Sequence, residues 1–179
     1  MTLKTSDCRL QVGVTLLAAL TWVAPTAAET LDRVLAVVAG ELITLTDVRA
    51  ATEFGFVTPP AGGDETRAVL NALIDRELEL AEVERYAPPE PSTADVDQGV
   101  AAVRARFPSD NAFTAALARA GVDAPHVRET VRDDLRIRAY LEQRFAMSDR
   151  RQQVIADWIS GLRRRADIID LYVAGQNAK

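Results

Sequence analysis

The chain has 179 residues, of which 48% are hydrophobic and 26% charged, and its net charge is −5. This composition fits a globular protein of one domain and argues against a disordered chain, which would contain fewer apolar residues. The acidic excess disfavours a nucleic-acid-binding protein, because phosphate binding requires clustered positive charge. One cysteine and one histidine exclude an intramolecular disulfide and a cysteine-rich zinc site, so we expect no bound metal.

The N-terminus has the pattern of a secretory signal peptide. Two basic residues precede an uncharged apolar run over residues 12–23, which is shorter than the roughly 20 residues needed to cross a bilayer. Small residues then predict cleavage after Ala28. The sequence therefore predicts a signal peptide over residues 1–28 and an exported domain over residues 29–179 that does not insert into the membrane. The exported part contains no cysteine, which suits an oxidising compartment.

The exported domain opens with the pattern of a β-hairpin. Two apolar runs within residues 33–44 flank Ala39 and Gly40, and glycine readily takes the positive φ that a tight hairpin turn requires. A two-stranded ribbon is only marginally stable by itself, so a further partner is expected.

Residues 46–162 read as helices separated by short breaks. A wide apolar arc on the fifth helix predicts neighbours on more than one side. Most starts are marked by a residue that can accept a hydrogen bond from the first turn, and most ends by glycine or proline. The expected starts are Thr46 for the first helix, Asp64 for the second, Ser92 or Thr93 for the third, Ser109 for the fourth, Asp123 for the fifth and Ser148 for the last; the expected ends are Gly55, Pro88, Pro108 and Gly121 for the first four.

The chain ends with a short strand pattern over residues 166–172, which is the candidate third partner for the hairpin. Trp158, in the last helix, is expected to be a core anchor packed against the N-terminal helices. The sequence thus predicts a mainly α fold of about six helices with a small antiparallel sheet formed by the N-terminal hairpin and the C-terminal strand. Within this single domain, residues 29–147 form an N-terminal segment that residues 148–172 complete.

Several residue types that are catalytic or bind ligands in other proteins have purely structural interpretations in this chain. His126 is expected on the surface, and the arginines at 163–165 suit the negative end of a helix dipole. The acidic residues of the second helix, and Asp133 with Asp134 in the fifth, alternate with arginines, which favours solvated helix faces with weak ion pairs. The four in the second helix are Glu77, Glu79, Glu82 and Glu84. With no phosphate-binding loop, nucleophile elbow or metal-ligand spacing, we expect no catalytic, cofactor-binding or metal-binding residue, and no enzyme.

The order of these segments resembles the SurA-like family of periplasmic chaperones, specifically their N-terminal domain. Five stretches carry the resemblance, from the valine-rich hairpin that leads into a capped helix to the terminal helix and strand. They are residues 31–48 (LDRVLAVVAGELITLTDV), 69–80 (VLNALIDRELEL), 94–100 (ADVDQGV), 127–145 with VRDDLRI at 131–137, and 158–169 (WISGLRRRADII). In this family, parvulin-type prolyl isomerase domains commonly separate the long helix from the terminal helix. Here residues 145–148 join the two directly, so the resemblance implies the chaperone module without the isomerase.

The resemblance implies an ATP-independent holdase in the periplasm that binds unfolded or extended polypeptides, such as outer-membrane protein precursors. Such a protein needs an apolar groove with a charged border. Four large apolar residues near predicted helix breaks are candidates for client contact: Phe54, Phe56, Phe145 and Met147. The alternative is a structural or adaptor protein of the cell envelope that uses the same fold to bind one dedicated partner. Either could be a monomer or a domain-swapped dimer.

Overall fold

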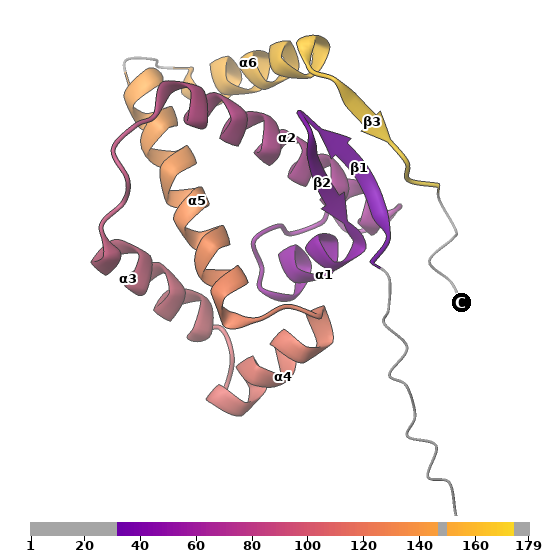
Figure 1. The fold of residues 1–179 in the computed structure, drawn as a ribbon, viewed down its shortest axis with the longest axis vertical. Coiled ribbons are helices and arrows are strands. Elements are labelled where there is room, and N and C mark those ends of the chain that lie inside the picture. The colour runs from indigo at the N-terminus through magenta and orange to yellow at the C-terminus, as the bar shows by residue number, and fades with distance from the viewer. Residues whose placement is uncertain (1–31, 147–149, 174–179) are drawn as a thin grey trace, which may run out of the picture. The chain divides into compact units, whose positions relative to one another are not determined.

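The hairpin and the C-terminal strand form one sheet in the computed structural model, which describes residues 32–146 and 150–173 (Figure 1). Strand β1 (Val34–Val38) pairs with β2 (Glu41–Thr44), and both turn residues, Ala39 and Gly40, have positive φ. Strand β3 (Ile168–Asp170) pairs antiparallel with the other edge of β1, so the order is β2-β1-β3. The prediction that the two distant segments pair is therefore confirmed. The signal peptide predicted over residues 1–28 lies outside the described residues.

The described residues also form six helices, so the mainly α prediction with a small antiparallel sheet is confirmed. Four of the predicted N-terminal caps, Asp64, Ser92, Ser109 and Asp123, accept a hydrogen bond from the backbone N–H three residues ahead. The helices are α1 (Leu45–Glu53), α2 (Glu65–Tyr86), α3 (Thr93–Arg104), α4 (Asp110–Ala120), α5 (Ala124–Arg144) and α6 (Arg151–Arg165).

Some predicted helix boundaries were wrong. Helix α1 is capped by Thr44 and not by Thr46, because Thr44 and Asp47 form a reciprocal capping box: the Asp47 carboxylate accepts from the Thr44 N–H at 2.8 Å while the Thr44 hydroxyl accepts from the Asp47 N–H. Helix α3 ends at Arg104, four residues before the predicted end at Pro108. The predicted start of the last helix, Ser148, lies outside the described residues.

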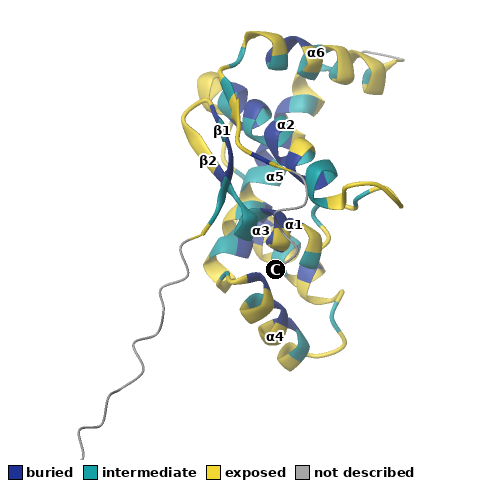
Figure 2. Cartoon of the chain, turned by 90° about the vertical axis from the view of Figure 1, so that its right-hand side faces the viewer, coloured by how far each residue is buried: buried dark blue, intermediate teal, exposed yellow. Residues whose placement is uncertain are grey.

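Three clusters of apolar side chains hold these elements together. Figure 2 shows in dark blue the buried positions of the helices and strands. The first joins the sheet to α1, α2 and α6 through residues such as Leu35, Ile74 and Leu162. The second joins α1, α3, α4 and α5 around Phe54. The third lies between α2 and α5, and Trp158 of α6 packs against it. Trp158 is only half-buried, so it borders the core and is not the buried anchor that its spacing suggested.

Side-chain contacts hold the C-terminal end of the described chain against the start of α2. The Tyr172 hydroxyl donates to the Asp64 carboxylate, which also caps α2. Arg67 donates to the Asp170 carboxylate and to the Tyr172 carbonyl oxygen, and its guanidinium lies 4.5 Å from the centre of the Tyr172 ring. These contacts hold β3 against β1 by a route independent of the sheet hydrogen bonds.

Candidate functional site

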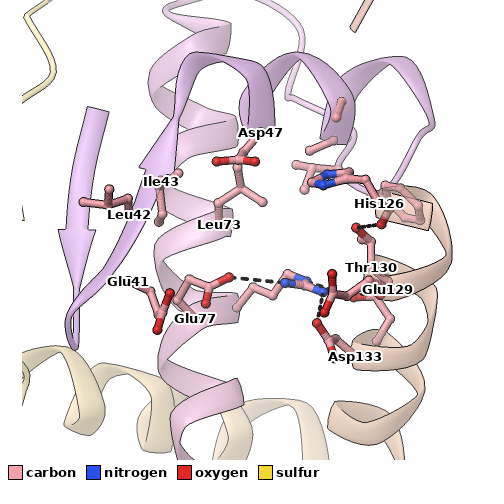
Figure 3. A pocket seen from close by; sticks show the side chains of 16 residues that line it. Glu41, Leu42, Ile43, Asp47, Leu73, Glu77, His126, Glu129, Thr130 and Asp133 are labelled. Atoms are coloured by element: carbon pink, nitrogen blue, oxygen red, sulfur yellow. Dashed lines mark hydrogen bonds and ion pairs between the residues drawn. The ribbon is translucent and has the colours of Figure 1, made fainter. Parts of the chain in front are cut away.

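A cleft with a volume of about 330 Å³ opens between the hairpin and three helices (Figure 3). Strand β2 forms one wall, α1 and the loop after it form the end, and α2 and α5 form the remaining walls. The hairpin reaches this position because the buried face of β1 packs on α2, while the Thr44 capping box turns the chain directly from β2 into α1. Segments far apart in the sequence therefore meet around one cavity.

Apolar side chains form the base of the cleft. Ile43 comes from β2 and Leu73 from α2, where both belong to the buried cluster under the sheet, and the remaining apolar residues come from α1 and the loop after it. Leu42 borders the cleft on β2, but its side chain lies on the outer face of the sheet and is 58% exposed (Figure 3). We call this surface the apolar floor; it consists of Ile43, Ala50, Ala51, Phe56, Val57 and Leu73.

Carboxylates surround the apolar floor. They come from β2, α1, α2 and α5 and outnumber the one guanidinium that lines the same cleft, that of Arg76. We call this set the acidic rim; it consists of Glu41, Asp47, Glu77, Glu129, Asp133 and Asp134.

The Arg76 guanidinium forms ion pairs and hydrogen bonds with several groups of α2 and α5. Its guanidinium lies 3.0 Å from Asp134, 3.2 Å from Glu77 and 3.7 Å from Asp133, and it donates to the Thr130 carbonyl oxygen at 3.3 Å. Burial would lower the pKa of Arg76, but these carboxylates outweigh it and raise the pKa above its usual value. The guanidinium thus ties α2 to α5 and has little capacity left to neutralise a ligand or the rest of the rim.

The cleft disfavours additional negative charge. Burial raises the pKa of Glu77, and the nearby Asp133 and Glu41 carboxylates raise it further, while Arg76 opposes the shift. Figure 3 shows Glu77 on α2 and Asp133 on α5, facing the space between the two helices. Chemically, the cleft offers apolar contact at its base and negative potential around its opening.

Of the four predicted client-contacting residues, the structure brings only Phe56 to the cleft, where it is half-buried. The expectation that Phe54 is exposed was wrong, since it is 1% exposed and packs edge-to-face against Phe107 and Phe113. Phe145 is half-buried at a different place, at the end of α5. Met147 lies outside the described residues.

Phe145 belongs to an aromatic cluster around a single guanidinium. Its ring centre lies 5.6 Å from that of Trp158, and Trp158 lies 6.0 Å from Tyr140, which in turn contacts Tyr86. The Arg144 guanidinium lies within 5.8 Å of all four rings. This cluster joins the ends of α2 and α5 to α6, and its position explains why Phe145 is withdrawn from solvent.

The acidic residues of α2 and α5 were misinterpreted as solvated. Glu84 is exposed, but Glu77 and Glu79 are half-buried and Glu82 is 9% exposed, because α2 is covered by the sheet, α5 and α6 on different sides. Asp133 and Asp134 are half-buried for the same reason. A sign was present in the sequence, since Arg76 and Glu77 shortly follow the apolar pair Leu73 and Ile74 on the same helix.

His126 lines the cleft and is half-buried, so its predicted surface position was only partly right. Its backbone N–H donates to the Asp123 cap, and no hydrogen bond joins its ring to another described residue.

Among residues 32–146 and 150–173, no group of three or more histidine, cysteine or acidic side chains is arranged to hold a metal ion. No helix in the same part of the chain has the length and apolar character to cross a bilayer. Comparison of the sequence with protein-family models and with curated proteins finds no match.

Proposed function

We propose that this protein is an ATP-independent periplasmic chaperone that holds unfolded exported polypeptides, with outer-membrane protein precursors as its expected clients. The observation that supports this most directly is the cleft, which combines an apolar floor with a charged border. Within the stretch 31–48 that resembles SurA-like chaperones, residues 34–48 form the hairpin and the start of α1, and these elements build two sides of the cleft.

The size of the cleft suits a holdase that works without nucleotide. A cavity of about 330 Å³ accommodates a few side chains of an extended client and not a folded domain. Such binding should be micromolar, about −8 kcal/mol, so that the client dissociates without an energy source. The acidic rim keeps the apolar surface soluble through charge repulsion.

Filling the cleft should impair the chaperone. Thr130 is half-buried in the α5 wall and its hydroxyl donates only to the backbone of the same helix, so Thr130→Trp places an indole in the cavity without disrupting the core. We expect client affinity to fall about tenfold, because losing the burial of one client side chain costs about 1.5 kcal/mol. The measurement is light scattering by an unfolded outer-membrane protein diluted from denaturant, with and without each variant.

The matched control is Ala139→Trp, which adds the same indole to an exposed position of α5 outside the cleft. This variant should protect the client as well as the unmodified protein does. If the unmodified protein leaves scattering unchanged at molar excess, the chaperone proposal is wrong.

The proposed location also has a direct test. Export with cleavage after Ala28 should yield a protein that begins at Glu29. Intact-mass measurement of the protein recovered from the periplasm of an expressing cell should show the loss of residues 1–28. A protein that retains these residues, or that stays in the cytoplasmic fraction, contradicts the proposal.

The second candidate is an envelope adaptor that binds one dedicated folded partner. It is favoured by a row of apolar side chains across the outer face of the sheet, where Val37 is paired in register with Leu42 on β2 and with Ile169 on β3. Leu42 and Ile169 are 58% and 49% exposed, which is unusual for large apolar residues in register on three strands. An adaptor would protect no unrelated client in the scattering assay and would bind a single protein, whereas a chaperone would protect several.

A further inference from the structure

The charge around the cleft is only partly balanced by the protein itself. Six carboxylates line it, and the one guanidinium among the lining residues, Arg76, is shared by Glu77, Asp133 and Asp134. Two further arginines of α5, Arg132 and Arg136, also pair with Asp133, so three guanidinium groups face six carboxylates. Glu41 is exposed and forms no ion pair with any described residue, and Glu129 lies 3.9 Å from one arginine on its own helix. Concave, low-dielectric walls concentrate such a field and raise the local concentration of cations.

The wall that carries Glu41 is also an open sheet edge. Within the described residues the strand order is β2-β1-β3, so β2 pairs with a strand on one side only. Its residues Glu41, Leu42 and Ile43 line the cleft (Figure 3). A free strand edge favours an extended peptide, because the peptide backbone can complete the unpaired hydrogen-bonding groups.

We propose that the cleft selects extended polypeptide segments in which lysine or arginine alternates with apolar residues. This inference rests on the proposed chaperone function and specifies which client segments it holds. Side chains of an extended segment point alternately to opposite sides. One set can therefore cover the apolar floor while the other reaches the carboxylates of the acidic rim. Acidic segments are rejected, since they would add charge to a cleft in which Glu77 already has a raised pKa.

The test uses three fluorescent peptides of one length with identical apolar residues, alternating with lysine, glutamine or glutamate. Fluorescence anisotropy at low ionic strength should rank affinity for the protein as lysine, then glutamine, then glutamate. We expect the lysine peptide to bind at least about tenfold more tightly than the glutamate peptide, a difference of about 1.4 kcal/mol. Raising the salt to about 1 M, where the screening length is about 3 Å, should remove most of this difference.

Substitutions in the acidic rim test whether the preference for the lysine peptide arises at the cleft. Glu41→Gln combined with Glu129→Gln removes two exposed rim charges without touching the core. This pair should weaken the lysine peptide about fivefold, from two interactions of about 0.5 kcal/mol each, and leave the glutamine peptide unchanged. The control, Glu84→Gln with Glu142→Gln, makes the same charge change at exposed positions outside the cleft and should alter neither affinity.

The outcomes separate the inference from the function on which it rests. If the three peptides bind equally well and scattering is still suppressed, the chaperone function stands and the selectivity is wrong. If the control pair weakens the lysine peptide as much as the rim pair does, the preference reflects net charge and not the cleft, and the inference is overturned. If no peptide binds and no client is protected, both proposals fail.

Discussion

Replacing Phe54 with alanine is expected to lower the free energy of unfolding by about 3–5 kcal/mol, the range for removing a buried aromatic side chain. Phe54 is 1% exposed and lies where α1, α3 and α4 meet. Its ring centre is 5.8 Å from those of both Phe107 and Phe113, and both pairs have edge-to-face geometry. Since domains of this size are stable by about 5–15 kcal/mol in total, this one truncation should remove much of the fold's stability. Urea denaturation followed by circular dichroism measures the loss.

A matched variant separates cavity formation from a loss of aromatic character. Phe54→Leu keeps most of the volume and should cost about 1–2 kcal/mol. Phe56→Ala, which truncates the half-buried ring at the cleft, should cost less than Phe54→Ala does and should weaken client binding more directly. If Phe54→Ala costs below about 1 kcal/mol, the ring is exposed in solution and the client-contact hypothesis for Phe54 regains support.

Replacing Glu79 with glutamine should stabilise the protein at pH 8 and have little effect near pH 4. Burial, followed by repulsion from Asp75, raises the pKa of Glu79 from 4.5 to about 7. A second, more open cavity beside Glu79 is lined by Asp134 and Arg138 of α5 and by Arg151 of α6, together with Arg76 of its own helix. None of these arginines forms an ion pair with the Glu79 carboxylate, so its charge is only weakly compensated.

The direction of this pH-dependent change in stability follows from proton linkage. The folded state binds the Glu79 proton more tightly than the unfolded state, so the contribution to stability is fully present below pH 4.5 and is lost as the pH rises to about 7 and above. If the whole pKa shift of Glu79 contributed to stability, it would change the free energy of unfolding by about 3 kcal/mol. Because Glu79 is half-buried and partly screened by water, we expect Glu79→Gln to raise the free energy of unfolding by about 1–2 kcal/mol at pH 8.

Denaturant titrations at pH 4 and pH 8 measure this difference, and Glu84→Gln is the control. Glu84 lies on the same helix and is exposed, so its replacement should leave the free energy of unfolding within about 0.5 kcal/mol at both pH values. Equal effects of the two substitutions at pH 8 would show that Glu79 is solvated in the folded protein.

The sequence predicted the features of this fold that depend on short-range interactions. Each correct helix start at Asp64, Ser92, Ser109 and Asp123 is a side chain that bonds to a backbone N–H three residues ahead, so the necessary groups are neighbours in the chain. The Ala39-Gly40 turn is likewise local. The third strand was predictable for a different reason, because a small hairpin needs a partner and residues 166–172 offered a strand pattern without one.

The expectation that Phe54 is exposed was wrong because burial there is decided by distant residues. Phe54 follows the last residue of α1, where a chain reversal usually exposes side chains, but the ring of Phe107 approaches it from the loop after α3 and the ring of Phe113 from α4. Phe56, two residues further on, remains half-buried at the cleft. Two phenylalanines with similar local sequence thus have different environments, and neither environment is encoded within a few residues of its position.

The cleft itself could not be read from the order of residues. Helical periodicity shows which residues share a face of α2, and composition shows that this helix is acidic. The number of its faces that are covered depends on the sheet, α5 and α6 all packing around it. That packing withdraws Glu77 and Glu79 from water and brings Arg76 and Glu77 to within reach of Asp133 at the cleft. The sequence by itself therefore determined the elements and their caps through local hydrogen bonds and periodicity, whereas the acidic rim and its electrostatics exist only because long-range apolar burial joins four separate elements.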